Sequence, residues 1–498
     1  MKIFSAAQIK QWDAFTIANE PVAPIELMER AATKCYQWIA EQHYTQQHFC
    51  IFCGKGNNGG DGLAIARMLL QNDYTVTIYI LEFGKLGSPD FQTNLAALHE
   101  YTSDIHFIQS PDFFPALNTN DIIIDALFGT GLNKPLEGIS AALVQHLNGS
   151  GNKIIAIDLP SGLFADTSSK DNTVIKATHT LSFQQYKLAF LLPENESHCG
   201  RVYLLDIGLD KQFENLTKTD FELTDAALIR SIYKPRNEFA HKGNFGHAAL
   251  FCGSYGMMGA AVLSAKACLR SGAGKLTCYI PKAGYEIIQA SVPEAMCMVS
   301  GEEYIVAAEN ITPFDAVGIG PGLGNHIPHA DLLKNIFINS KKPLLIDADA
   351  LNTIGLDKSL LAFIPKNSIL SPHPKEFERV FGPTANDVER LQLALQKSKE
   401  YNIYIILKGH HSFISTPMGK GFFNSTGNAG MATAGSGDVL SGILTGLLAQ
   451  GYTSLEASLL GTYLHGLAGD RAAAALSQEA MIAGDIINYL GEAFKTLL

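Results

Sequence analysis

The chain has 498 residues, of which 47% are hydrophobic and 17% are charged, and its formal net charge is −11. This length exceeds one ordinary core and predicts two or three domains, while the composition is that of a folded globular enzyme. The negative charge and the lack of a long basic run argue against nucleic acid as a partner. A nucleotide ligand would have to be held locally, by backbone amides and a few cations.

The N-terminal residues lack the uninterrupted apolar stretch of a secretory signal, and no apolar run is long enough to span a bilayer. We therefore expect a cytoplasmic protein with no membrane partner. The eight cysteines fit a reducing compartment. Cys50 and Cys53 form a C-x-x-C pattern in an apolar, strand-like run, where odd spacing directs them to opposite faces. Buried thiols are expected there, ahead of a redox or zinc pair.

The first half alternates helical and strand-like segments. Ser5 is a candidate N-cap, and helices are predicted over residues 24–42 and 62–70. Apolar, β-branched runs predict strands at residues 49–53, 75–81, 121–127, 153–159, 178–183 and 202–207. Continuous apolar strands separated by helices predict a mostly parallel sheet that is covered on both faces.

Polar clusters follow three of these strands, at residues 54–62, 125–132 and 158–162. In parallel sheets ligands bind beyond the carboxyl ends of the strands, so the three clusters could form one cleft floor. The side-chain oxygens of Asn58, Asp125 and Ser161 are hard ligands, suited to a group I or II cation. Taken singly, Asn58 equally fits a turn and Asp125 a capping carboxylate.

A dinucleotide-binding dehydrogenase is one alternative for this half. Gly54, Gly56 and Gly59 match G-x-G-x-x-G, and Glu82 stands near the place of a ribose-binding acid. Asp61, at the start of the next helix, argues against it because a carboxylate there would repel a pyrophosphate.

Together, residues 57–62, 125–131 and 158–162 resemble the NAD(P)H-hydrate epimerase domain, and the resemblance covers most of residues 1–220. It implies a Rossmann-like three-layer sandwich that interconverts the R and S epimers of hydrated NAD(P)H. It also implies K⁺ bound at Asn58, Asp125 and Ser161, and a proton-transfer role for Asp158. The substrate contacts implied are Asn57, Asn58, Gly59, Gly60, Asp61, Gly129, Thr130, Gly131, Leu132, Asn133, Lys134, Pro135 and Asp158.

The boundary between the halves is expected near residue 222, which gives domains of residues 1–222 and 223–498. No Gly/Ser-rich linker joins them, so packed domains are expected. Strands are predicted in the second half at residues 247–252, 275–280, 315–319, 343–346, 368–370 and 403–407. They predict a second α/β domain with helices on both faces of its sheet.

The glycine-rich residues 427–438 run into the apolar residues 439–448, which read as a buried helix. Free amides at such a helix start suit a phosphate or a developing oxyanion. Asp438 would repel an anion there unless it accepts a proton from an attacking hydroxyl. The alternative is a loop that is merely packed tightly under a helix.

Other polar residues follow the strands of the second half. Residues 408–409, a lysine and a glycine, suit a nucleotide phosphate or ribose, or else a surface turn. His373 lies between prolines and fits either a ligand contact or a structural histidine. Asp347 and Asp349 could hold Mg²⁺ through water or cap the turn. His465 is interpreted as a core or intersubunit residue.

Residues 435–438, 408–409 and 320–322 resemble the ribokinase-like superfamily. The finer pattern of residues 256–261, 345–352, 371–374 and 427–438 resembles NAD(P)H-hydrate dehydratase, over about residues 225–498. With the epimerase-like half ahead of it, the chain resembles bifunctional NAD(P)H-hydrate repair enzymes. It departs from its relatives at Ser436, where the superfamily usually has alanine, and at Met258, where relatives often have threonine.

The resemblance implies a reaction for this half. Asp438 deprotonates the hydroxyl of the S epimer, which attacks the terminal phosphoryl of ADP, and phosphate then leaves with formation of AMP. The amides of residues 435–437 and Mg²⁺ would hold the charge. The nucleotide contacts implied are Lys408, Gly409, His410, His411, Ser412 and Gly437, and the contacts to the hydrated ring are Ala260, Gly322, His373 and Asp438. The implied partners are hydrated NADH and NADPH, ADP, and copies of the chain in a homo-oligomer such as a tetramer.

Two alternatives stay open at this point. The second half could be a small-molecule kinase whose phosphorylated product is stable, since the glycine-rich motif and its aspartate fit both reactions. The first half could be a non-catalytic binding or oligomerisation module. The presence of Asn58, Asp125, Asp158 and Ser161 argues against a non-catalytic module.

Overall fold

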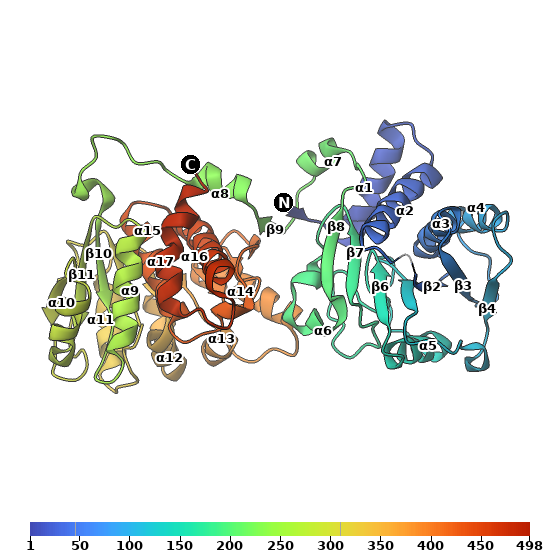
Figure 1. Cartoon of the computed structure of the whole chain (residues 1–498). Coiled ribbons are helices and arrows are strands. Elements are labelled where there is room, and N and C mark those ends of the chain that lie inside the picture. The colour runs from blue at the N-terminus through green and yellow to red at the C-terminus, as the bar shows by residue number, and fades with distance from the viewer. Residues whose placement is uncertain (45, 309) are drawn as a thin grey trace. The chain divides into compact units, whose positions relative to one another are not determined.

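The computed structural model describes residues 1–44, 46–308 and 310–498. The chain forms two compact units (Figure 1). The N-terminal unit comprises residues 2–219 with 386–388, and the C-terminal unit comprises residue 1 with residues 220–385 and 389–498. Within the described ranges, none of the helices is both long and apolar enough to cross a bilayer.

The helices of the N-terminal unit are α1 (Ala6–Asn19), α2 (Pro24–Glu41), α3 (Asn57–Gln71), α4 (Pro89–Leu98), α5 (Gly138–Gly149), α6 (Glu196–Cys199) and α7 (Lys211–Leu216). Its strands are β1 (Lys2–Ile3), β2 (His48–Cys53), β3 (Thr75–Leu81), β4 (Ile105–Ile108), β5 (Ile122–Ala126), β6 (Lys153–Ile157), β7 (His179–Phe183) and β8 (Arg201–Leu205). Ser5 is the N-cap of α1 as predicted, because its hydroxyl accepts the amide of Gln8.

The sheet of this unit runs in the order β4-β3-β2-β5-β6-β7-β8, and its pairs are parallel. Helices α2 and α3 cover one face of the sheet, and α5 covers the other (Figure 1). Cys50 and Cys53 belong to these two different clusters, as their odd spacing predicted. The unit is the predicted three-layer α/β sandwich.

One helix begins earlier than predicted. Helix α3 starts at Asn57 and not at Gly62, so the polar segment after β2 forms the first turns of the helix. The chain can turn this tightly because Gly59 has no side chain. A Cβ at this position would lie 1.7 Å from the carbonyl oxygen of Gly54 and collide with it. The predicted cleft residues Asn58 and Asp61 are therefore held by a rigid element.

The helices from residue 226 onward are α8 (Ala226–Ile232), α9 (Met258–Arg270), α10 (Tyr285–Ser291), α11 (His329–Asn339), α12 (Ala348–Leu356), α13 (Pro374–Phe381), α14 (Asp387–Tyr401), α15 (Ser436–Ala449), α16 (Ser454–Leu476) and α17 (Ala483–Lys495). The strands are β9 (Phe221–Thr224), β10 (His247–Phe251), β11 (Lys275–Ile280), β12 (Met296–Val299), β13 (Ala316–Ile319), β14 (Leu344–Ile346), β15 (Ile369–Leu370), β16 (Tyr404–Leu407), β17 (Phe413–Ser415) and β18 (Gly421–Asn424).

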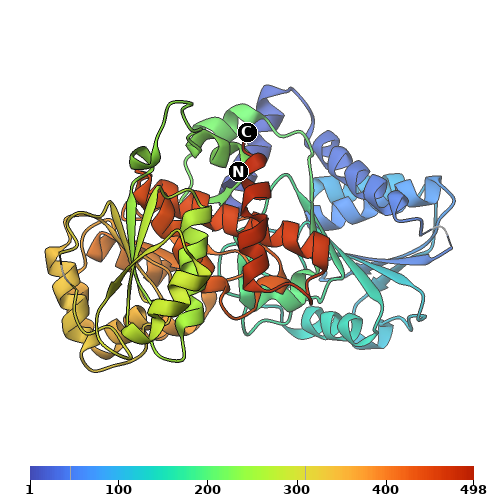
Figure 2. The same cartoon turned by 60° about the vertical axis from the view of Figure 1, so that its left-hand side comes forward.

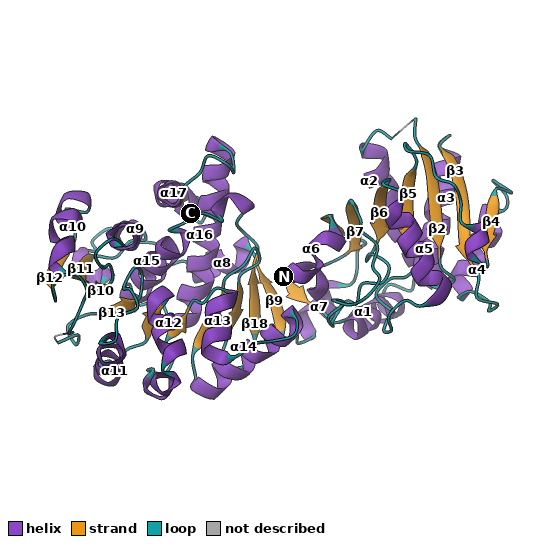
Figure 3. Ribbon diagram, turned by 90° about the horizontal axis from the view of Figure 1, so that it is seen from below, coloured by secondary structure: helices purple, strands orange, loops and turns teal. Residues whose placement is uncertain are grey.

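The strands of the C-terminal unit lie in the order β9-β18-β17-β16-β15-β14-β13-β10-β11-β12. The run from β16 to β12 is parallel, whereas β17 pairs antiparallel with both β16 and β18. Helices α9, α15, α16 and α17 bury their apolar faces against one side of this sheet (Figure 2). Figure 3 shows α11, α12 and α13 on the opposite side. Helices cover both faces as predicted, and the β17–β18 hairpin is an addition that the sequence pattern did not reveal.

Candidate functional sites

A cavity of about 1330 Å³ opens in the N-terminal unit beyond the carboxyl ends of β2, β5 and β6. It brings together residues from all three predicted clusters. Of the predicted substrate contacts, those that line it are Asn57, Asn58, Asp61, Gly129, Thr130, Gly131, Leu132, Asn133 and Asp158. Gly59 and Gly60 lie buried within α3, and Lys134 and Pro135 are exposed outside the lining.

Asp125 and Ser161, two of the three predicted K⁺ ligands, are in direct contact. The Ser161 hydroxyl donates to the Asp125 carboxylate at 2.6 Å and the Ser161 amide donates to it at 2.8 Å. Burial raises the pKa of Asp125 to about 6, although these hydrogen bonds oppose the shift. Asn58 stands beside Gly129, and its buried amide nitrogen and oxygen have no hydrogen-bond partner among the described residues.

An orphaned buried amide oxygen is costly unless a cation or water satisfies it. The Ser161 hydroxyl accepts the amide of Phe128, the residue before Gly129, at 2.9 Å. Asn58, Asp125 and Ser161 all offer hard oxygen ligands, so this donor set fits a cation of the K⁺ type.

Asp158, the predicted proton-transfer residue, reaches the cavity from the end of β6. Its carboxylate accepts the ammonium of the buried Lys187 at 2.6 Å and the amide of Phe183 at 3.3 Å. Lys187 is further held by the Ser182 hydroxyl at 2.7 Å. The φ angle of Asp158 is +64°, a left-handed conformation that is uncommon for a residue other than glycine. This strained backbone and the buried ion pair fix the carboxylate in the cavity.

Two further carboxyls line the same cavity. Burial and then the charge of Asp158 raise the pKa of Asp13 to about 6, against the opposing charge of Lys187. Burial, followed by the charges of Asp158 and Asp13, raises the pKa of Asp61 well above its usual value. Perturbed carboxyls that gather in one cleft are typical of proton-transfer sites. Sequence reasoning missed Asp13 and Lys187, because neither lies in a recognisable motif.

In the C-terminal unit, the glycine-rich loop leads into α15 at Ser436. Gly435 is the N-cap with φ of +89°, a conformation that favours glycine. No backbone acceptor is seen for the amides of Gly437 and Asp438 within the described chain, as expected for the first turn of a helix. Burial and then the charge of Asp347 raise the pKa of Asp438 to about 7, whereas Lys408 lowers it. A carboxyl and free amides therefore meet at one helix start.

Lys408 lies at the end of β16, close to this helix start. A Cβ added to Gly437 would lie 3.5 Å from the Lys408 ammonium nitrogen. That nitrogen is 2.8 Å from a carboxylate oxygen of Asp347 and 3.8 Å from one of Glu376. Burial opposes the charge of Lys408, but these carboxylates outweigh it and raise its pKa. The structure thus places Lys408 beside the loop, and a contact of Lys408 with a nucleotide stays a prediction.

The carboxylates that could hold Mg²⁺ are largely engaged elsewhere. Asp347 accepts Lys408, the hydroxyl of Ser441 and the amide of Ala348, which it caps. Asp349 accepts the amide of Gly324 at 2.8 Å. Asp347 therefore acts as a helix cap and an ion-pair partner, and Asp349 accepts hydrogen bonds from Gly324 and Asn352.

Three of the predicted contacts of the hydrated ring follow strands of the sheet: Ala260 lies in the first turn of α9 after β10, Gly322 follows β13, and His373 follows β15. Gly322 has φ of +62°, and a Cβ there would lie 2.9 Å from the side chain of Ala260. His373 caps α13, its imidazole accepting the amides of Lys375 and Glu376 at 3.1 and 3.3 Å. Its structural role is thus established by contacts, and its ring remains partly exposed.

The remaining predicted nucleotide contacts form a tight turn after β16. The Ser412 hydroxyl donates to the Gly409 carbonyl at 3.1 Å, and the rings of His410 and His411 lie 4.4 Å apart. Burial and then the neighbouring His410 lower the pKa of His411 to about 4, so its ring is neutral at physiological pH.

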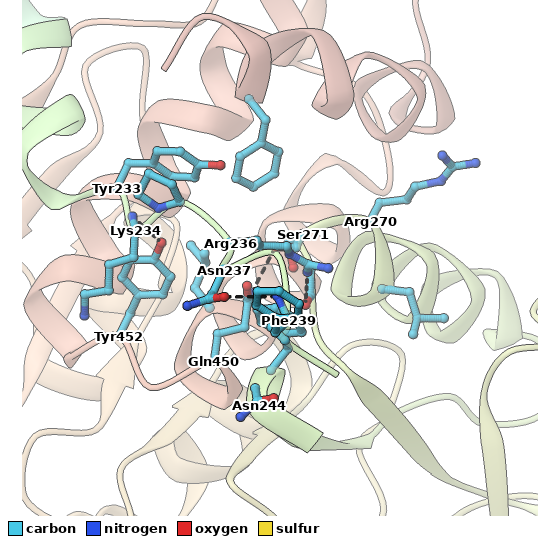
Figure 4. A pocket seen from close by; sticks show the side chains of 17 residues that line it. Tyr233, Lys234, Arg236, Asn237, Phe239, Asn244, Arg270, Ser271, Gln450 and Tyr452 are labelled. Atoms are coloured by element: carbon cyan, nitrogen blue, oxygen red, sulfur yellow. Dashed lines mark hydrogen bonds between the residues drawn. The ribbon is translucent and has the colours of Figure 1, made fainter. Parts of the chain in front are cut away.

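A second hollow, of about 690 Å³, lies in the C-terminal unit beside residues 233–245 (Figure 4). Two of its cationic side chains contact the surrounding protein. Arg236 donates to the carbonyl of Gly272 at 2.6 Å and stacks on Phe245 at 3.9 Å, and Lys234 pairs with a carboxylate of α16. Because these residues lead into the amino end of β10, the hollow lies away from the strand ends that carry the candidate site.

The two units define the class of the protein: an α/β enzyme with a Rossmann-like N-terminal part and a ribokinase-like C-terminal part. A family model described as NAD(P)H-hydrate dehydratase matches residues 248–491, and one described as YjeF-related protein N-terminus matches residues 24–189. The bifunctional NAD(P)H-hydrate repair enzyme of Moorella thermoacetica is 35% identical over 100% of this chain and 97% of its own length. The chain therefore belongs to the family of bifunctional NAD(P)H-hydrate repair enzymes.

A further relative and a solved structure are also similar to this chain. The bifunctional NAD(P)H-hydrate repair enzyme of Escherichia coli K12 is 33% identical over 93% of this chain and 88% of its own. A crystal structure of the Bacillus subtilis ADP/ATP-dependent NAD(P)H-hydrate dehydratase, grown with ATP and Mg²⁺, is 27% identical. It covers 55% of this chain and 98% of its own, with a TM-score of 0.48.

Proposed function

We propose that this chain repairs hydrated NADH and NADPH in two steps, with the functional boundary near residue 222. The N-terminal part interconverts the R and S epimers, and the C-terminal part uses ADP to dehydrate the S epimer. The main support for the dehydration step is the position of Asp438. Its carboxyl has a pKa near 7 and lies beside the free amides at the start of α15.

Dehydration needs a leaving group better than hydroxide. Asp438 in its ionised form accepts the proton of the substrate hydroxyl, and the hydroxyl oxygen forms a bond to the terminal phosphorus of ADP while AMP departs. The amides of Gly437 and Asp438 stabilise the charge that develops on the phosphoryl oxygens. Inorganic phosphate then leaves from the ring carbon, the ring loses a proton, and the reduced nicotinamide double bond returns.

Lys408 is suited to a structural and an electrostatic task in this step. Its ammonium lies between Asp347 and the loop, so it can place a positive charge near the phosphates of the nucleotide. Residues 409–412 form the adjacent turn that would contact the nucleotide. Mg²⁺, when bound, would neutralise phosphate charge. Because Asp347 and Asp349 are engaged by other groups, we propose that it is held chiefly by the nucleotide.

Epimerisation requires that the bond between the ring carbon and its hydroxyl oxygen be broken and then formed on the other face. One group must protonate the departing hydroxyl, and one must accept a proton from the water that adds. Asp158 is placed for one of these tasks by Lys187. Asp13, whose pKa is near 6, is the best candidate for the other, since it can donate or accept a proton at physiological pH.

A K⁺ ion would be held by Asn58, Asp125 and Ser161. Support comes from the unpartnered amide oxygen of Asn58 and from the direct contact between the two other hard oxygen ligands, Asp125 and Ser161. When bound, the ion would supply fixed positive charge at the cavity floor, and the three residues would orient the turn at Gly129 for the substrate. A cytoplasmic location and a homo-oligomeric assembly stay predictions from the sequence.

The test compares ADP with ATP as donor for the purified full-length protein, with chemically hydrated NADH as substrate. We expect the absorbance of reduced nicotinamide to return with ADP, together with equal amounts of AMP and phosphate. A stable phosphorylated product without return of absorbance would identify a small-molecule kinase instead.

A further inference from the structure

We infer that helix α16 braces both ends of the catalytic loop, with His465 and Asp470 as the positioning residues. The catalytic loop is residues 427–438, from Gly427 to Asp438. The inference deepens the proposed dehydratase function and rests on it. Neither residue touches the reacting atoms; each acts through the loop that carries the amides and the base.

His465 holds the end of the loop at the start of α15. Its Nε2 lies 3.0 Å from the carbonyl oxygen of Ser436 and 3.3 Å from the Ser436 hydroxyl. A carbonyl oxygen can only accept, so Nε2 carries the proton and donates it. Burial, and also the charge of Lys408, lower the pKa of His465 to about 4, so the ring is a neutral donor at physiological pH.

The bond to the Ser436 carbonyl orients the group that would face the phosphate. This carbonyl and the amide N–H of Gly437 belong to one planar trans peptide, so they point in opposite directions. Fixing the carbonyl on α16 therefore fixes the direction of the Gly437 amide. Hydrogen bonds in a chain also polarise one another, so donation to the carbonyl strengthens the amide as a donor.

Asp470 holds the other end of the loop. One carboxylate oxygen accepts the amide of Gly427 at 3.0 Å, and the other accepts the side-chain amide of Asn428 at 2.9 Å. The side-chain oxygen of Asn428 in turn accepts the amide of Gly430 at 3.0 Å. The φ of Gly427 is +111°, a conformation that needs glycine. The carboxylate thus secures the turn that starts the loop.

The helix surface between these two residues is shaped for the loop. A Cβ at Gly466 would lie 2.3 Å from the Thr426 hydroxyl, and one at Gly469 would lie 2.3 Å from the sulfur of Met431. Larger residues would push the loop away from α16. Residues 465–470 therefore combine two polar side chains that hold the loop with two glycines that let it approach closely. A role in positioning the loop accounts for all four residues, whereas a position in the core or at a subunit interface does not.

The test uses H465A, H465Q and D470N in the full-length chain, with R471A as a matched control on an exposed site of the same helix. Dehydration of the S epimer with ADP and epimerisation are measured on each variant. For H465A we expect kcat of dehydration to fall by about ten- to a hundredfold, since loss of a whole oxyanion donor costs about 10²–10³ in kcat. The KM for the S epimer should change less than about threefold, because the ring contacts are untouched.

Glutamine can also donate an N–H, so H465Q should recover most of the lost kcat, whereas a packing defect would not be rescued in this way. D470N should lower kcat less than H465A does, because one acceptor remains. Epimerisation by all variants, and both activities of R471A, should equal those of the wild type. These activities show that each variant is folded.

The inference is overturned if H465A keeps kcat within threefold of the wild type, or if H465Q is as impaired as H465A while epimerisation is intact. If H465A fails to fold, D470N decides: its kcat of dehydration should fall by more than about threefold with epimerisation intact, and a smaller fall would overturn the inference. The variant D438N separates this inference from the proposed function. If D438N is inactive and H465A is active, the positioning role of His465 is refuted and the proposed dehydratase function stands. If D438N is fully active, the assignment of Asp438 as the base is refuted.

Discussion

Replacing Asp438 with asparagine removes the proposed base and little else. Asparagine has nearly the same shape, and the amides at the start of α15 and the ammonium of Lys408 stay in place. The pKa of Asp438 lies near 7, so the active carboxylate and its protonated form are both populated in the neutral pH range. A base with a pKa close to the working pH is the most effective kind.

The expected loss of kcat for D438N is about 10²–10⁴, the usual contribution of a general base. The thermal stability of D438N, by contrast, should equal or exceed that of the wild type at alkaline pH. The pKa of Asp438 is raised in the folded protein, so the unfolded chain binds fewer protons between the ordinary value of 3.8 and about 7. Stability therefore falls as pH rises through this window, and D438N should have a Tm at pH 8 equal to or above that of the wild type.

The assay follows reduced nicotinamide absorbance with the pure S epimer and saturating ADP, and it measures epimerisation on the same protein sample. Unchanged epimerisation shows that D438N is folded. A fall in kcat of less than about tenfold would remove Asp438 from the role of base. A Tm at pH 8 well below that of the wild type would contradict the pKa argument.

Three further results are expected. The kcat/KM of dehydration should rise about tenfold per pH unit up to pH 7 and then level off. The variant K408M should shift this rise to higher pH, because the charge of Lys408 lowers the pKa of Asp438. A kcat/KM that does not change between pH 5 and 8 would contradict the role of Asp438 as base. D158N should abolish repair of the R epimer beyond its spontaneous rate, with S-epimer repair intact; equal R-epimer repair would remove Asp158 from catalysis. N58A should epimerise only at higher K⁺ concentration, as titration with KCl at constant ionic strength would show; an unaltered K⁺ dependence would argue against the cation site.

The layered architecture could be predicted from the sequence because it follows from local pattern. Continuous apolar runs such as residues 49–53 and 153–157 are long enough to mark buried parallel strands. The helix boundary at Asn57 was predicted wrongly, since its glycines suggested a loop. In the structure the same glycines let the first turn of α3 pack against Gly54. Short strands such as β17 gave no periodic signal of their own.

The motif residues that line the N-terminal cavity could be placed together because each motif follows the end of a strand. Parallel strands end at one edge, so Asp125 and Ser161 meet although 36 residues separate them. Their partners could not be predicted. Asp13 comes from a helix far from any motif, and Lys187 lies in a loop that folds back on Asp158. Such contacts depend on tertiary packing, which leaves no local trace in the sequence.

The role of His465 also depends on tertiary packing that the sequence does not reveal. The sequence interpretation placed it on a helix, in the core or at a subunit contact. Its contact with Ser436 depends on how α16 packs beside α15. The glycines that flank it were the available signal, since they allow a close approach by a neighbouring backbone.

In the most direct test of the two-step repair, the wild-type protein is incubated with ADP and an equal mixture of the R and S epimers of hydrated NADH. The account predicts full return of the reduced nicotinamide absorbance, faster than spontaneous epimerisation, with one AMP and one phosphate formed for each NADH. Return of only half the absorbance on that timescale would contradict the epimerase, and no return would contradict the dehydratase.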